Sequence, residues 1–219
     1  MEECKPMLNT GLRGITIADT RICDVDGARG RLIYRGYVVT DLAKYASFEE
    51  IVYLLLYESL PSKDELTEFN NRLKAERSIP EEVIAALKTR PKNALPMDIL
   101  QCSVPMLAQH DPDINDSSSE VAAEMAIRLI AKFATVVAAW HRLRNDKEPI
   151  APSPDLGHAA NFLYMLDGTV PDEDVAKFMD DGAEILCVLE YSDSGGAVLV
   201  HLHLTALATT ILLVGISLE

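Results

Sequence analysis

Two histidines near the carboxyl end, His201 and His203, form a His-x-His pair. On a strand both rings would lie on the same face and could hold a metal ion. On a helix they would diverge by about 200°. No third ligand is evident nearby, and a zinc site needs at least three protein ligands. We therefore predict no metal site.

Paired acids recur at the predicted starts of helices. These pairs are Glu49 with Glu50, Glu81 with Glu82, and Glu173 with Asp174. A general base needs a cleft that excludes water and a nearby partner, whereas a carboxylate in the first turn of a helix is stabilised by the helix dipole. We interpret these acids as solvated partners of helix ends, without a catalytic role.

His158 lies beside an apolar run and close to Asn161 in the stretch DLGHAANFLYM. A lone histidine in such a place usually satisfies a local hydrogen bond, so we predict a structural role at a helix start. The chain shows no glycine-rich phosphate loop, no Gly-x-Ser-x-Gly elbow and no Cys-His arrangement with supporting context. No catalytic residue is predicted from the residues alone.

The composition describes an acidic globular protein. Of 219 residues 48% are hydrophobic, and 34 acids oppose 20 bases to give a net charge of -14. Clustered lysine and arginine are needed to neutralise phosphate, so we expect no binding to nucleic acid and none to anionic lipid. A chain of this length forms one large domain or two modest ones.

The four cysteines are scattered, with no Cys-x-x-Cys spacing; they are Cys4, Cys23, Cys102 and Cys187. This favours reduced thiols and a cytoplasmic location. The first ten residues lack the pattern of a targeting segment.

Short strands are expected first. Residues 15–37 are β-branched and punctuated by glycine, which predicts a small hairpin or extended arm. The chain then looks helical. Ser47 with Glu50 and Ser62 with Glu65 have capping-box spacing and predict two helix starts.

Further helices are predicted from hydrophobic spacing and from proline positions. Their expected ranges are about 80–87, 97–108, 120–144 and 156–166, with another starting near Pro171. Pro105 lies inside the second of these and predicts a kink or a split there. Residues 111–120 are predicted to form a surface loop.

The segment 196–218 carries no Lys, Arg, Asp or Glu and is long enough to cross a bilayer. It lacks flanking basic residues and boundary aromatics, so membrane insertion is not favoured. A buried helix, or an alternating strand starting at AVLVHLHL, remains open.

Several runs are too particular to arise from generic helix patterning. The longest are GRLIYRGYVVTDLAKYASFEEIVYLLLY at 30–57 and EPIAPSPDLGHAANFLYMLDG at 148–168, with GLRG at 11–14, Leu60-Pro61, Pro96-Met97-Asp98 and LIAKFATVVAAWHRLR at 129–144. Together they resemble the amino-terminal half of the citrate synthase family. The likeness covers about residues 11–180 and then fades.

The resemblance implies condensation of acetyl-CoA with oxaloacetate to citrate and CoA, with acetyl-CoA as co-substrate and no metal or other cofactor. The family's Gly-Pro-Leu-His-Gly-Gly loop and its later histidine, aspartate and arginines do not occur in this chain. Leu189, Glu190 and Tyr191 stand where the family's Leu-His-Ala-Asp-His stretch would be sought. The catalytic and cofactor-binding residues carried over are therefore none.

Two positions are weaker points of the resemblance. Arg13 lies in the GLRG element, where some family members place an arginine near the CoA phosphates and others a glutamate. Gly157 replaces the serine usual before His158, so the capping hydroxyl is missing and that helix start should be weaker.

The expected fold class is all-α: a citrate synthase-like helical bundle, a partial large domain, preceded by a short β-hairpin or extended arm. We expect the arm at 1–37 and the helical portion at 38–219, with a divergent apolar tail from about 181. We expect a truncated or divergent form that is inactive alone. The alternative is a noncatalytic helical module that dimerises or pairs with a full-length citrate synthase. Homodimers or self-association are expected, because apolar helices lack their partners.

Overall fold

The computed structural model describes residues 20–26, 29–116 and 118–180. The elements are β1 (Cys23–Asp26), β2 (Arg31–Tyr34), β3 (Tyr37–Val38), α1 (Val39–Tyr45), α2 (Phe48–Tyr57), α3 (Lys63–Ala75), α4 (Glu81–Lys88), α5 (Pro96–Ala108), α6 (Ser119–Arg144) and α7 (His158–Asp167). The fold is mostly helical with short strands before the helices, which confirms the predicted fold class.

The three strands form an antiparallel sheet in the order β1-β2-β3, one strand more than a hairpin. Tyr34 pairs with Tyr37, and the two residues between them, Arg35 and Gly36, have φ angles of 47° and 92°. Positive φ at both central residues is the requirement of a type I′ hairpin turn. The Arg35 guanidinium donates to the Leu55 carbonyl at 3.1 Å, which ties this turn to α2.

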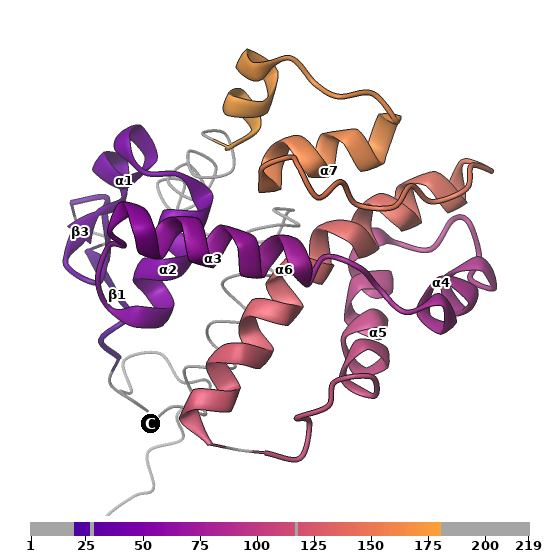
Figure 1. The fold of residues 1–219 in the computed structure, drawn as a ribbon, viewed down its shortest axis with the longest axis horizontal. Coiled ribbons are helices and arrows are strands. Elements are labelled where there is room, and N and C mark those ends of the chain that lie inside the picture. Colours follow the sequence, from indigo (N-terminus) through magenta and orange to yellow (C-terminus); the bar gives the residue numbers. More distant parts are fainter. Residues whose placement is uncertain (1–19, 27–28, 117, 181–219) are drawn as a thin grey trace, which may run out of the picture.

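Helix α6 is the central element of the bundle (Figure 1). It crosses the middle of the molecule and contacts α3, α4, α5 and α7. Small side chains on α6 let these neighbours approach closely; the buried ones are Ala122, Ala126, Ala131, Ala134, Ala138 and Ala139. The largest hydrophobic cluster joins α2, α3 and α6 through residues such as Leu54, Phe69 and Ile127. The core therefore surrounds α6 on several sides.

Both predicted capping boxes are confirmed. The Ser47 oxygen accepts from the Glu50 amide at 3.3 Å while the Glu50 carboxylate accepts from the Ser47 amide at 2.7 Å. The same reciprocal pair forms between Ser62 and Glu65 at the start of α3. Each box satisfies backbone donors that a helix start would otherwise leave open.

Of the predicted kink or split at Pro105, the split does not occur, because α5 is continuous from Pro96 to Ala108. Pro105 lies in the last turn, where the loss of one backbone donor interrupts little of the helix. The turn still closes, since the Gln109 amide donates to the Pro105 carbonyl at 3.2 Å. At the other end of the helix, Pro96 occupies a first-turn position that suits proline.

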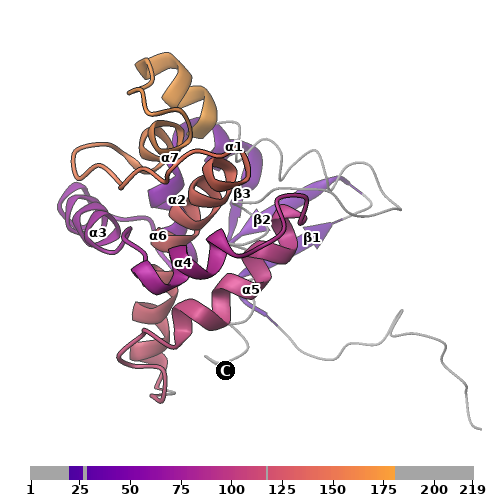
Figure 2. The same cartoon turned by 90° about the vertical axis from the view of Figure 1, so that its right-hand side faces the viewer.

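The remaining helix predictions hold within a few residues. The long helix runs over Ser119–Arg144, and residues 173–180 are helical after Pro171. Figure 2 shows this last helical segment beyond α7, on the side away from α4 and α5. None of the helices in the described ranges has the length and apolar content needed to cross a membrane. The apolar segment 196–218, with His201 and His203, lies outside the described residues.

Candidate functional site

A buried polar cluster joins α2, the turn after α3, α6 and the loop before α7. We call it the Arg77 cluster; its members are Glu49, Arg77, Thr135, Ser153, Leu156, His158 and Asn161. Arg77 is 1% exposed, and one of its terminal nitrogens donates to the carbonyls of Ser153 at 3.2 Å and Leu156 at 2.8 Å. Burial lowers the pKa of Arg77, and the charge of Glu49 partly opposes that effect.

Other members of the Arg77 cluster also bind backbone groups. The Asn161 side-chain oxygen accepts from the Ser153 amide at 2.7 Å. The Thr135 hydroxyl donates to the Arg77 carbonyl at 2.7 Å. These bonds are made to backbone groups, so the side chains fix the chain path and are not aimed at an open space.

His158 begins α7, as predicted, and is 3% exposed. Its ring stacks on Phe48 with centroids 4.8 Å apart, and its amide donates to the Glu49 carboxylate at 3.1 Å. Gly157 gives this helix no side-chain cap, as expected, and Glu49 from α2 supplies the missing acceptor. Glu49 thus differs from the solvated role we predicted for it, since it is half-buried and caps another helix.

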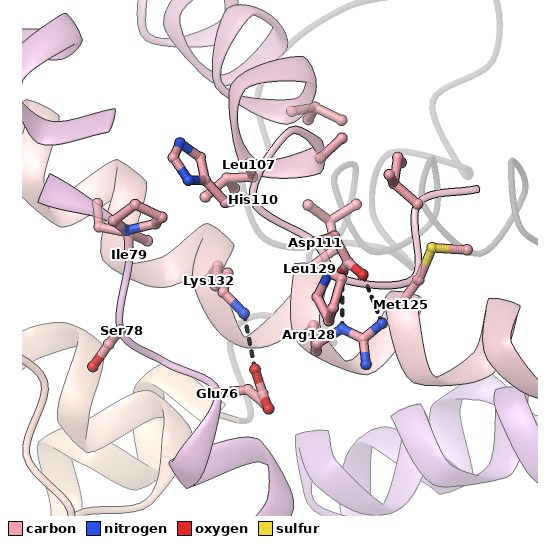
Figure 3. A pocket seen from close by; sticks show the side chains of 15 residues that line it. Glu76, Ser78, Ile79, Leu107, His110, Asp111, Met125, Arg128, Leu129 and Lys132 are labelled. Atoms are coloured by element: carbon pink, nitrogen blue, oxygen red, sulfur yellow. Dashed lines mark hydrogen bonds and ion pairs between the residues drawn. The ribbon is translucent and has the colours of Figure 1, made fainter. Parts of the chain in front are cut away.

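A pocket with a volume of about 540 Å³ lies between α5 and α6. We call it the α5–α6 pocket. Its walls are mainly apolar, with Leu107 from α5, Met125 and Leu129 from α6, and Ile79 from the turn before α4 (Figure 3). Arg128 and Lys132 lie along the same edge of α6.

The cations of this pocket are already neutralised. Arg128 forms a forked pair with Asp111, with both nitrogen to oxygen distances at 2.8 Å, and a third bond to Asp113 at 2.8 Å. Lys132 donates to Glu76 at 2.9 Å, as Figure 3 shows. Burial raises the pKa of Asp111, but the hydrogen bonds from Arg128 outweigh it and hold that pKa below its ordinary value. The pocket offers apolar surface and little free positive charge.

Sequence reasoning missed both features. Asp111 and Asp113 fall in the stretch predicted as a solvated surface loop, and their partner Arg128 is 17 residues away from Asp111. Nothing in the sequence distinguishes Arg77 from an exposed arginine. The other paired acids were predicted to be solvated, and they are exposed: Glu81, Glu82, Glu173 and Asp174. Arg13, Cys4 and Cys187 lie outside the described residues.

No group of three or more His, Cys, Asp or Glu that could hold a metal ion exists within residues 20–26, 29–116 and 118–180. In the same ranges, the buried polar side chains are Arg77, Ser103, Thr135, His158 and Asn161. Ser103 donates to the Ile99 carbonyl at 2.7 Å, within its own helix. We find no converging acid, base and cation of the kind that a reaction centre needs among these residues.

Comparison with known proteins gives the family. The model described as "Citrate synthase, C-terminal domain" matches residues 11–188. The chain belongs to the citrate synthase family. The match ends at residue 188, eight residues beyond the point near 180 where the resemblance was expected to fade.

Curated relatives give the same result. A citrate synthase of Acidithiobacillus ferridurans is 40% identical over 181 residues, covering 80% of this chain and 47% of that protein. A 2-methylcitrate synthase of Mycobacterium tuberculosis is 37% identical over 173 residues, covering 79% of this chain and 44% of that protein. The chain spans about half the length of these citrate synthase relatives.

The solved structures agree with the sequence comparison. The crystal structure of citrate synthase from Pyrobaculum aerophilum superposes with a TM-score of 0.74 at 34% identity, covering 80% of this chain and 46% of that one. Citrate synthase from Thermotoga maritima gives a TM-score of 0.71, also at 34% identity. The citrate synthase fold is therefore shared over the part that both chains contain.

Proposed function

We propose that this chain supplies the helical scaffold of a citrate synthase-type acyltransferase and that these 219 residues alone have no turnover. The observation that carries the proposal is the family match over residues 11–188 without the family's catalytic motifs. The reaction in question joins acetyl-CoA to oxaloacetate. Because a 2-methylcitrate synthase is among the relatives, a larger acyl-CoA is an alternative to acetyl-CoA as the substrate.

The chemistry explains why the scaffold is insufficient. Removing a proton from a methyl group needs a positioned base, and the new enolate oxygen needs a hydrogen-bond donor aimed at it. Two substrate carboxylates need forked arginine contacts. Among the described residues Arg128 makes a forked contact of this kind, but it makes it to Asp111, with a further bond to Asp113.

Release of free thiol from acetyl-CoA in the presence of oxaloacetate tests this proposal. The purified chain should give no release above the rate without protein. Coexpression with the remaining half of the Acidithiobacillus ferridurans citrate synthase should produce a stable complex with measurable turnover, because the missing groups are then present. Turnover by the chain alone would contradict the proposal.

The alternative is a noncatalytic module that forms a homodimer or pairs with a full-length citrate synthase. The α5–α6 pocket supports it, because its lining includes Val104, Leu107 and Leu129 on two adjacent helices. A second helical pair could cover such a surface. The free thiols of Cys23 and Cys102 are compatible with a cytoplasmic location for either function.

Light scattering after size-exclusion chromatography tests the dimerisation alternative. The wild-type chain should run at twice its chain mass of 24.1 kDa. The variant Met125→Glu places a charge on the apolar wall and should shift the protein to monomer with unchanged circular dichroism. Lys147→Glu, at an exposed position outside the pocket, is the matched control and should leave the dimer intact. A monomeric wild-type chain would contradict the dimerisation alternative.

A further inference from the structure

A second cavity, of about 210 Å³, lies between the first turns of α5, the end of α6, and α7. We call it the Trp140 cavity. Its apolar walls include Ile99 from α5, Val137 from α6, and Phe162 and Leu166 from α7. It is distinct from the α5–α6 pocket and shares none of that pocket's lining residues.

The indole of Trp140 contributes to the wall of this cavity and is 3% exposed. Its Nε1 is buried and has no hydrogen-bond acceptor within the described part of the chain. A buried N–H without an acceptor is unfavourable, and each such group in a native fold calls for an explanation.

Two further polar groups line the same cavity, His141 and Arg144, both from the last turn of α6. Neither side chain forms an ion pair or hydrogen bond with another residue that the structure describes. Arg142, between them, is engaged differently, since it donates to the carbonyls of Glu148 at 2.6 Å and Leu166 at 3.0 Å. Arg144 is therefore a half-buried residue whose guanidinium has donors to spare.

The Trp140 cavity suits an anionic head group better than the α5–α6 pocket does. Arg128 has its carboxylate partners within the protein, whereas Arg144 has none in the described ranges. Apolar walls with a few converging polar groups are the usual composition of a small-molecule site. An apolar body would lie against Val137 and Phe162, and a carboxylate would meet Arg144.

We propose that the Trp140 cavity binds a small amphiphilic monocarboxylate, with its alkyl chain among α5, α6 and α7 and its carboxylate at Arg144 and His141. At the roughly 30 Å³ that a water molecule occupies in the liquid, the cavity holds about seven heavy atoms of similar size. This volume matches the alkyl part of a straight-chain acid of up to eight carbons, since octanoate has seven carbons beyond its carboxylate and the carboxylate itself meets Arg144 and His141. The site lies outside any role that the acyltransferase proposal gives to this chain.

Trp140 reports on its own cavity, because it is the single tryptophan of the chain. Titration of the purified full chain with butanoate, hexanoate and octanoate should change its fluorescence saturably. Each added methylene should tighten binding roughly fourfold, the equivalent of the ~0.8 kcal/mol gained by burying one CH₂. Longer acids should stop gaining once the cavity is full. No saturable change with octanoate would overturn the proposal.

Two variants test the two ends of the ligand. Arg144→Gln should weaken octanoate roughly tenfold, as expected for loss of a charged hydrogen bond, and should leave octan-1-ol unchanged. Val137→Phe should fill the cavity and abolish binding of both molecules, with circular dichroism confirming the fold. Lys63→Gln, on α3, is the control and should bind octanoate normally. Equal affinity for octanoate and octan-1-ol, or undiminished binding to Val137→Phe, would overturn the proposal.

Discussion

The Arg77 cluster and the α5–α6 pocket use charged residues in opposite ways. In the Arg77 cluster a buried arginine binds two backbone carbonyls of a loop nearly 80 residues away. In the pocket, Arg128 lies at the edge and is neutralised by carboxylates of the neighbouring loop. The first arrangement fixes distant segments to one another. The second leaves a large apolar surface between two helices.

The Arg77 cluster stabilises the fold, whereas the α5–α6 pocket is a surface available to a partner. Buried polar groups in the Arg77 cluster cannot be removed without leaving carbonyls or amides unsatisfied. Most apolar side chains of the pocket walls, such as Met125 and Leu129, are only half-buried, and a partner could cover them without rearranging the core. The stability of the fold should therefore depend more on the first region, and its assembly more on the second.

The largest expected effect is that of Arg77→Met. The substitution keeps most of the side-chain volume but leaves the carbonyls of Ser153 and Leu156 without their donor in a buried site. We expect a loss of about 3 kcal/mol in the free energy of unfolding. Denaturant melts followed by circular dichroism would measure it.

Arg77→Lys and Asn161→Ala sharpen this result. Lysine retains a charge and a donor, so it should lose less than methionine does. Asn161 binds the amide of Ser153 and Arg77 binds its carbonyl. The losses of unfolding free energy caused by Arg77→Met and Asn161→Ala should therefore be non-additive by about 1 kcal/mol when the two are combined. A cost below about 1 kcal/mol for Arg77→Met would mean that the loop is held by other contacts.

A smaller, pH-dependent effect is expected from Asp111→Asn. The pKa of Asp111 lies below its ordinary value of 3.8 in the fold, so its stabilisation is complete above about pH 5 and is lost as the pH falls through the folded-state pKa. At neutral pH the substitution should cost about 2 kcal/mol, because the forked pair with Arg128 is partly buried. The cost should shrink as the pH is lowered through the folded-state pKa of Asp111.

Asp116→Asn provides the comparison in the same region. Hydrogen bonding with Ser118 lowers the pKa of Asp116, yet Asp116 is exposed and has no ion pair among residues the structure describes. Its substitution should change stability much less than Asp111→Asn at neutral pH. Urea melts at a series of pH values would record both. A cost for Asp111→Asn that does not vary with pH would contradict the expected ion pair.

The helices could be predicted well because their signals are local. A serine followed three residues later by glutamate fixes a helix start without help from the rest of the chain, and Ser47 and Ser62 both behave so. The rule that proline breaks a helix is also local, but α5 is continuous through Pro105. The effect of this proline depends on how near the end of the helix it lies.

The site residues could not be predicted because their partners are far apart in sequence. Arg77 is recognisable only once Ser153 and Leu156 are beside it. Glu49 looks like any acid in a first helical turn until α7 is placed against α2, where it caps His158. In both cases a tertiary contact decides the role of the side chain.

The smallest expected effect compares the two capping boxes. Ser47→Ala and Ser62→Ala each remove one acceptor at a helix start and should cost about 1 kcal/mol. The Ser47 box is half-buried and lies directly before Phe48 and Glu49, which contact His158, whereas the Ser62 box is exposed. Water can replace the lost acceptor at Ser62 more easily, so Ser47→Ala should cost more by a few tenths of a kcal/mol. Paired thermal melts would measure the difference, and a larger cost for Ser62→Ala would show that the Arg77 cluster does not depend on the start of α2.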